Sequence, residues 1–227
     1  SAVEATFAGE AVELASKKIS ISSRTMSPKR VGLPIDVSNQ ALTQENVNLP
    51  AAILEALGNS VLISTHKYIF GNTTMGGAGD CILKPVYDKA AQVTLANLNN
   101  KAVVAMETAV LSQNYIPAED MGAYIMSAKM YGELKSTPIE KGDSKMILAD
   151  DRMNGYPVLM SQFIPEDIVV FGCWRYLVAG QFGNPRITID PLTLANKDST
   201  RFVINTDVDA KLLLPDAFTA IKVKAGS

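Results

Sequence analysis

The residues of this 227-residue chain best suited to nucleophilic chemistry are two cysteines, Cys81 and Cys173, and a single histidine, His66. A cysteine nucleophile needs a base within hydrogen-bond reach and surroundings that lower the pKa of its thiol. His66 falls within a predicted long helix, which favours a residue of the helix surface or of a subunit contact. The Gly-Cys-Trp context of Cys173 lacks the pattern found around papain-type cysteines. We therefore interpret Cys173 as a small buried thiol in a core strand, with a cysteine hydrolase as an alternative.

The other candidates for chemistry are weaker. Asp150 and Asp151 are adjacent, so on a strand they would point to opposite faces and on a turn both would be solvated. The sequence GGAGD at 76–80 is not followed by Lys-Ser or Lys-Thr and opens no clear helix, so it fits neither the P-loop nor the dinucleotide pattern and is interpreted as a flexible loop. One histidine excludes a histidine-rich metal site, whereas an all-carboxylate magnesium site stays open. We expect no catalytic residue, no cofactor and no metal ion.

The composition limits the classes of partner. Hydrophobic residues make up 47% of the chain, and 21 basic residues against 23 acidic ones give a net charge of -2, so no global basic field would hold a nucleic acid or an anionic membrane. The apolar runs are far shorter than the roughly 20 residues of a membrane span. The two cysteines match neither a disulfide framework nor a CxxC site, which favours a reducing compartment. No signal peptide precedes Ser1, and without an initiator methionine we expect a processed product or part of a longer chain.

The elements that would position these residues begin with extended segments. Residues 1–40 alternate apolar and polar positions in KKISISSRT and again in RVGLPIDVS, with one apolar stripe at best, which predicts an arm and not a core. From Leu49 to about Gly71 the spacing predicts a long helix. Its expected apolar face consists of Ile53, Leu54, Leu57, Val61, Leu62, Tyr68 and Ile69.

The middle of the chain alternates helices and strands. A second helix is predicted from Thr94, as its cap, to about Gln113. GAYIMS then predicts a short strand, AKMYGELKS a short helix and STPIEKGDSK a polar loop. The expected buried face of the second helix is Leu98, Ala102, Ala105, Met106, Ala109 and Val110.

The remainder of the chain predicts strands. YPVLMSQFI and DIVVFGCWRYLVAG are two extended runs that we expect to lie antiparallel or side by side in one sheet, with Trp174 buried in the second. ITIDP, RFVINTDVDAKLLL and AFTAIKV add further strands. The fold class is therefore α+β, with strands concentrated at both ends and helices between them.

The order of these segments resembles the major capsid proteins of tailed double-stranded DNA bacteriophages, whose fold encapsulin shells share. GEAVELASKKISISSRTMSPKRVGLPIDVSNQAL is similar to the returning half of that family's extended loop, and the helix from Leu49 followed by FGNTTMGGAGD is similar to its spine helix and glycine-rich loop. LANLNNKAVVAMETAVLSQ, AYIMSAKMYGELK and DDRMNGYPVLMSQFIPEDIVVFGCWRYLVAG resemble the axial domain. ITIDP through VDAKLLLPDAFTAIKV resembles the closing strands. The shared order over most of the chain, and not any one motif, carries the resemblance.

The resemblance implies a phage major-capsid-protein fold with three regions. Residues 1–34 would be the returning strand of the extended loop. The peripheral domain, with its spine helix, would comprise 35–93 and 187–212. The axial domain would comprise 94–186 and 213–224, and Trp174 and Cys173 would belong to one of its packed strands.

The resemblance also implies a function. The protein would be a non-enzymatic structural subunit that assembles with itself, as hexamers and pentamers, into an icosahedral shell around phage or prophage DNA, with an encapsulin-like nanocompartment shell as the alternative. Portal, scaffold and decoration proteins would be partners, packaged DNA would be contacted weakly, and no membrane would be involved. The location would be the virion capsid, and the host cytoplasm during assembly. The expected subunit-contact residues of the arm are Lys17, Lys18, Arg24, Lys29 and Arg30.

Overall fold

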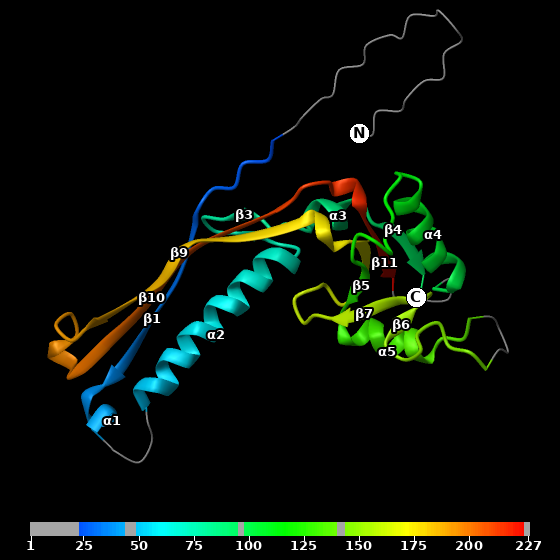
Figure 1. The fold of residues 1–227 in the computed structure, drawn as a ribbon. Helices are drawn as coiled ribbons and strands as arrows, with labels where there is room; N and C mark the ends of the chain where they lie inside the picture. Colours follow the sequence, from blue (N-terminus) through cyan, green and yellow to red (C-terminus); the bar gives the residue numbers. More distant parts are fainter. Residues whose placement is uncertain (1–22, 44–48, 95–97, 140–143, 225–227) are drawn as a thin grey trace, which may run out of the picture.

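The chain folds into two differently shaped parts (Figure 1). In the elongated part a long helix lies along a three-stranded sheet, and the compact part is built around a six-stranded sheet. Two long strands of the elongated part lead directly into the compact part (Figure 1). The computed structural model describes residues 23–43, 49–94, 98–139 and 144–224.

The elongated part contains the strands β1 (Lys29–Ser38), β9 (Leu177–Asp190) and β10 (Ser199–Leu212), in the order β1-β10-β9 with both pairings antiparallel. The helices α1 (Asn39–Thr43) and α2 (Leu49–Phe70) follow β1. The β9–β10 ladder shifts register between Asn205 and Asp207, because residues 183–185 of β9 oppose the single residue Thr206 of β10. Gly183, in this bulge, has φ 76°. The prediction of an arm is wrong for residues 29–38, which form an edge strand paired with β10 along its whole length. Residues 1–22 of the predicted arm lie outside the described residues.

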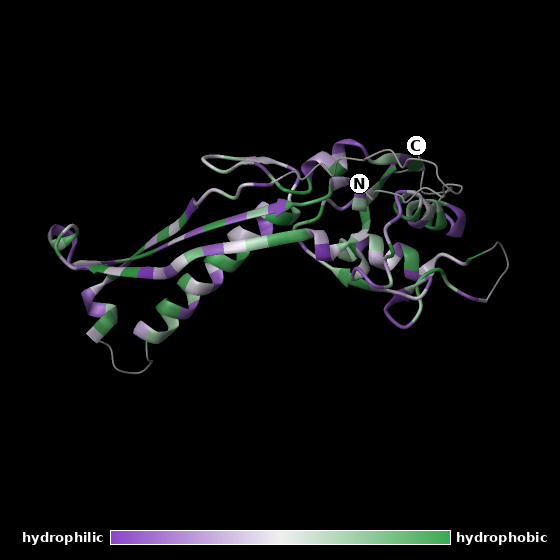
Figure 2. Cartoon of the chain, turned by 45° about the horizontal axis from the view of Figure 1, so that its top comes forward, coloured by the Kyte–Doolittle hydropathy of each residue, from purple (hydrophilic) through white to green (hydrophobic). Residues whose placement is uncertain are grey.

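Strict alternation along β10 builds the core of the elongated part. Phe202 and Ile204 are buried against Ile53 and Leu57 of α2, because alternate residues of a strand share one face. Figure 2 shows hydrophobic and hydrophilic residues alternating along the long strands. The predicted helix from Leu49 to about Gly71 is confirmed.

The predicted apolar face of this helix is only partly confirmed. Leu57, Tyr68 and Ile69 are buried, but Leu54 and Leu62 are exposed, the latter by 57%. The reason is that α2 packs on one side only, against β1 and β10. A helix on a single sheet buries a narrower stripe than a helix covered on two sides, and the outer leucines fall beyond it.

The sheet of the compact part contains β4 (Ala91–Thr94), β5 (Gly122–Met126), β6 (Arg152–Met153), β7 (Tyr156–Met160), β8 (Ile168–Cys173) and β11 (Phe218–Lys224), in the order β4-β11-β8-β5-β7-β6. The largest cluster of buried hydrophobic side chains among the described residues forms around this sheet. The hairpin of β2 (Thr74–Met75) and β3 (Gly79–Asp80) lies between α2 and this part in sequence. Three short 3-10 turns also occur, at Trp174–Tyr176, Ala195–Lys197 and Pro215–Ala217. The helices of the compact part are α3 (Lys84–Asp88), α4 (Asn100–Leu111) and α5 (Ala128–Ser136).

The second helix differs from its prediction at its start and on its face. Thr94 ends strand β4, and the cap of α4 is Asn99, whose side chain accepts a hydrogen bond from the Ala102 N–H at 3.1 Å. The buried residues of α4 are Val103, Met106 and Val110, whereas Ala105 and Ala109 are exposed. Larger side chains at one-turn spacing thus face the sheet, and the alanines face outward.

Two strand predictions need correction. β7 and β8 belong to the same sheet and run antiparallel, but β5 lies between them and pairs with both. The run DIVVFGCWRYLVAG is not one strand, because β8 ends at Cys173, the turn Trp174–Tyr176 follows, and β9 begins at Leu177. The predicted strand at 122–127 and helix at 128–136 are confirmed as β5 and α5.

The predicted domain boundaries fall inside continuous strands. β1 runs through the boundary at residue 34, and β9 runs through the boundary at residue 186. The division into an extended loop, a peripheral domain and an axial domain stays a prediction.

Candidate functional site

Cys173 lies in a core and not in a catalytic wall. It is the last residue of β8 and is fully buried. Burial, and secondarily the negative charge of Asp120, raises the pKa of the Cys173 thiol to about 11. A nucleophilic cysteine needs the opposite shift, since the thiolate is the reactive form. His66 is exposed on α2, with its ring 6.3 Å from that of Phe163. These surroundings favour the structural interpretation of both residues.

Trp174 is placed differently from the prediction. It begins the 3-10 turn after β8 and is half-buried, whereas the neighbouring Cys173 occupies the core. The indole N–H donates a hydrogen bond to the Ala123 carbonyl at 2.9 Å, and its ring lies 6.1 Å from Phe70 and 5.3 Å from Phe218. Trp174 therefore joins the end of α2 to the six-stranded sheet instead of filling the main core layer.

The other candidate sites have ordinary structural roles. Asp150 and Asp151 form an exposed turn with φ values of 51° and 54°, and Asp151 accepts a hydrogen bond from the Tyr131 hydroxyl. The glycine-rich segment 76–80 closes the β2–β3 hairpin, where Gly77 and Gly79 have positive φ. Among the described residues, no group of three or more His, Cys, Asp or Glu side chains could hold a metal ion. In that same part of the chain, no helix is long and apolar enough to cross a membrane.

Strand β9 exposes several hydrophobic residues that the other described elements leave uncovered. Ile187 and Ile189 pair with Ile204 and Phe202, and register partners share a face of the sheet, so both isoleucines lie on the side that α2 covers over β1 and β10. Both are nevertheless exposed, Ile189 by 59%. We call Ile187 and Ile189, together with Leu192 of the turn after the strand, the β9 surface. Val178 and Phe182 are also exposed, but they pair with Lys211 and Asp207 and lie on the opposite face of the sheet.

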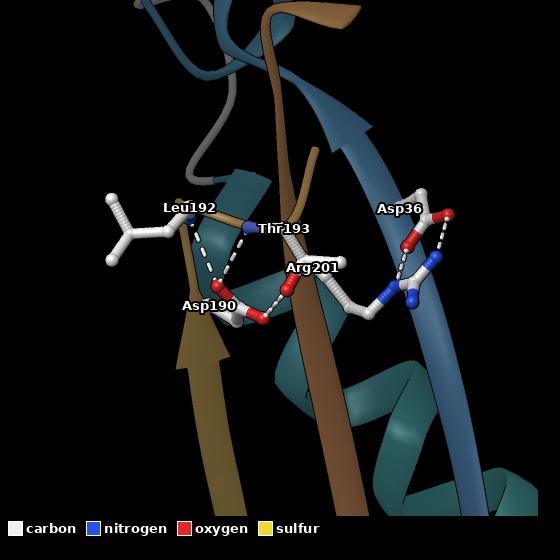
Figure 3. A network of polar contacts seen from close by, with 5 residues as sticks. All are labelled: Asp36, Asp190, Leu192, Thr193 and Arg201. Atoms are coloured by element: carbon white, nitrogen blue, oxygen red, sulfur yellow. Dashed lines mark hydrogen bonds and ion pairs between the residues drawn. The ribbon is translucent and has the colours of Figure 1, made fainter. Parts of the chain in front are cut away.

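The turn after β9 holds the most exposed of these residues in a fixed conformation. Asp190 accepts hydrogen bonds from the N–H groups of Leu192 (2.9 Å) and Thr193 (3.1 Å) and from the Thr193 hydroxyl. On the neighbouring strands, Arg201 donates two hydrogen bonds to Asp36, at 2.6 and 2.9 Å. Figure 3 shows the Leu192 side chain pointing away from this network. Leu192 is 82% exposed, so a rigid turn presents an apolar side chain to the outside.

The five predicted contact residues of the arm differ in where they lie and in what they contact. Lys17 and Lys18 lie outside the described residues, and Arg24 is exposed in the segment before β1. Lys29 and Arg30 bind within the subunit, since Lys29 forms an ion pair with Asp209 at 3.2 Å and Arg30 Nε donates to Asn205 Oδ1 at 2.7 Å. A contact of these residues with a neighbouring copy stays a prediction.

Sequence reasoning missed Asp209. Along β10 the even positions are apolar or threonine and the odd positions are mostly polar, which predicts an outward, solvated Asp209. The side chain is instead fully buried, because residues distant in sequence cover it. Alternation within one strand carries no signal for such a cover.

Comparison with known proteins agrees with this architecture. The model of the Phage capsid family matches residues 1–223, and the chain therefore belongs to this family. It is 25% identical over 197 residues to a major capsid protein of Halomonas phage phiHAP-1, an alignment that covers 86% of this chain and 32% of that protein. The chain thus spans about a third of the length of this relative.

Solved capsid structures share the fold. The capsid of a native GTA particle has a TM-score of 0.72 at 15% identity, covering 96% of this chain and 81% of the other. A structure of Mycobacterium phage Adephagia has a TM-score of 0.72 at 12% identity, covering 99% and 82%. The satellite phage P4 procapsid has a TM-score of 0.67 at 12% identity, covering 99% and 80%. The α+β capsid fold expected from the sequence is confirmed.

Proposed function

We propose that this protein is a structural subunit that assembles with copies of itself into the icosahedral shell of a phage or prophage. The observation that carries the proposal, beside membership of the family, is the β9 surface. Contiguous exposed apolar residues on a sheet face indicate a contact with another molecule. In a shell, a second copy of the chain would cover them, and several modest contacts of this kind per subunit become stable together because each copy is held by many neighbours.

The proposed partners follow from the same function. Hexamers and pentamers of the chain would form the shell, with portal, scaffold and decoration proteins as further partners. The net charge of -2 supports only weak, local contact with packaged DNA. The subunit would be made in the host cytoplasm and end in the virion capsid.

The proposal includes no catalytic turnover. Burial and the raised pKa of Cys173 argue against a thiol hydrolase. The relative described above is a major capsid protein, and two of the structures are a capsid and a procapsid, so an encapsulin-like shell is the less favoured alternative.

Assembly of a matched pair of variants tests the proposal. In Ile187→Thr/Ile189→Thr the β-branched shape is kept, so the strand should form, but the apolar surface is reduced. We expect electron microscopy to show closed particles for the unmodified protein and mainly free subunits for the variant, with unchanged circular dichroism. The control Thr188→Val changes an exposed residue that points to the opposite face of β9 and should leave particles intact. Equal particle yields from the double variant and the unmodified protein would contradict the role of the β9 surface.

A further inference from the structure

A buried carboxylate holds the chain where it enters the three-stranded sheet. Asp209 Oδ2 accepts the Ser27 N–H at 2.9 Å, and Asp209 Oδ1 lies 3.2 Å from Lys29 Nζ. The Tyr68 hydroxyl donates to Asp209 Oδ1 at 3.1 Å. Three segments therefore meet at one side chain: residues 23–28, which we call the lead-in segment, together with α2 and β10.

Lys29 completes the cluster. Its ammonium group donates to the Tyr68 hydroxyl and lies 4.6 Å from the centre of the Tyr68 ring. Burial alone would raise the pKa of Asp209, but the hydrogen bonds from Ser27, Lys29 and Ala210 outweigh it, and the pKa lies below its ordinary value of 3.8. The carboxylate is thus charged at neutral pH, and loss of either partner would leave the other charge poorly compensated.

The lead-in segment also rests on β9. Gly180 is the register partner of Asp209, and a Cβ atom on Gly180 would lie 3.2 Å from Met26 Cε. Met26 thus lies directly over Gly180, while the next residue, Ser27, bonds to Asp209. The lead-in segment therefore crosses the sheet at one fixed pair of residues.

The cluster is not needed to hold β1 in the sheet. All ten residues of β1 have register partners on β10, and the first of these pairs is Lys29 with Val208. The hydrogen bond to Ser27 lies before that first pair. What the cluster adds is the direction in which the chain leaves the sheet toward its N-terminus.

We propose that Asp209, Lys29 and Tyr68 are positioning residues for assembly, which fix the lead-in segment so that its exposed residues, Arg24 among them, meet a neighbouring copy in one orientation. This inference rests on the proposed shell function. The charged carboxylate of Asp209 is the centre of the cluster, since it contacts the lead-in segment, α2 and Lys29.

The test compares Asp209→Asn with Asp167→Asn. Asparagine keeps the size of Asp209 but removes the charge that orders Ser27 and Lys29. Asp167 forms a partly exposed ion pair with Lys222 at 3.3 Å in the compact part and is the control. Hydrogen exchange of the subunit, followed by mass spectrometry, should show peptides from residues 23–30 exchanging at least about tenfold faster in Asp209→Asn, as expected when a charge-assisted hydrogen bond is lost. Peptides from β8 should be unchanged, which a general loss of stability would not allow.

Assembly of the same variants is the second measurement. We expect Asp209→Asn to lose most closed particles and Asp167→Asn to retain them. Unchanged exchange at residues 23–30, or normal assembly despite faster exchange, would overturn the inference. If the unmodified protein itself forms no particles, the shell function fails, whereas the exchange comparison still decides whether the cluster fixes the lead-in segment. Should Asp209→Asn not fold, Tyr68→Phe removes one hydroxyl from the cluster, keeps the ring, and should raise exchange in the same peptides.

Discussion

The two parts of the subunit treat hydrophobic residues in opposite ways. In the compact part every residue of the neighbouring strands β5 and β8 is buried. In the elongated part no residue of the 14-residue strand β9 is buried, although several are large and apolar. The compact part therefore completes its own core, whereas the elongated part exposes hydrophobic residues that its described elements do not cover.

Layer geometry explains the difference. The strands β5 and β8 lie at the centre of a six-stranded sheet, with strands on both sides of each. The elongated part has one long helix over a three-stranded sheet, and α2 packs against β1 and β10. A single helix is too narrow to cover the whole face of a three-stranded sheet, so the third strand, β9, stays exposed on that face. One fold thus contains a region that closes its own core and a region whose sheet is only partly covered.

A pair of phenylalanines provides the largest expected contrast between the parts. Phe171 in β8 is fully buried and packs 4.5 Å from the ring of Tyr124, whereas Phe182 in β9 is 39% exposed. Phe171→Ala should lower the free energy of unfolding by about 3–5 kcal/mol, because it creates a cavity in a closed core. Phe182→Ala should cost less than about 1 kcal/mol in the free subunit. Urea titrations followed by circular dichroism would measure both, and similar losses would contradict the division into two parts.

Two leucines of α2 sharpen the comparison within the elongated part. Leu57 is fully buried against β10, whereas Leu62 is exposed. Leu57→Ala should destabilise the subunit by about 2–4 kcal/mol, and Leu62→Ala, with the same change in size and helix propensity, by less than about 0.5 kcal/mol. Thermal unfolding of both variants is the measurement. A large loss for Leu62→Ala would mean that α2 is covered on two sides in the free subunit.

The smallest expected effect concerns the junction of the two parts. Trp174→Phe keeps an aromatic ring near Phe70 and Phe218 but removes the hydrogen bond to the Ala123 carbonyl. We expect a loss of about 1 kcal/mol, typical of one hydrogen bond, measured by urea unfolding monitored by circular dichroism because the only indole is gone. A loss as large as that of Phe171→Ala would show that the indole belongs to the main core after all.

Local patterns in the sequence predict single elements well. Ala128–Ser136 forms the expected helix because Ser127 caps it, accepting a hydrogen bond from the Met130 N–H, and its buried residues Met130 and Leu134 are one turn apart. The predicted start of α4 was wrong because Thr94 and Asn99 are both residue types that cap helices well. Only the pairing of Ala91–Thr94 with the distant strand β11 assigns Thr94 to a strand.

Relations between distant segments were the part that the sequence could not predict. The insertion of β5 between β7 and β8 depends on pairings that no local alternation encodes. The burial of Asp209 depends on Ser27 and Lys29, which are far away along the chain. The candidate surface on β9 was missed for the same reason, because its hydrophobic residues look like those of a buried strand until the extent of α2 is known.

The bulge between Asn205 and Asp207 has a mechanical consequence. The 14-residue strands β9 and β10 run from the elongated part into the compact part, so torsion between the parts acts on their ladder. A bulge interrupts ladder hydrogen bonds and increases local twist. Within the bulged segment of β9, Pro185 has no N–H to donate and Gly183 has a left-handed φ of 76°. The ladder is therefore most compliant at this position. In the proposed shell, subunits at sites of different curvature would differ in twist there while both hydrophobic cores keep their packing.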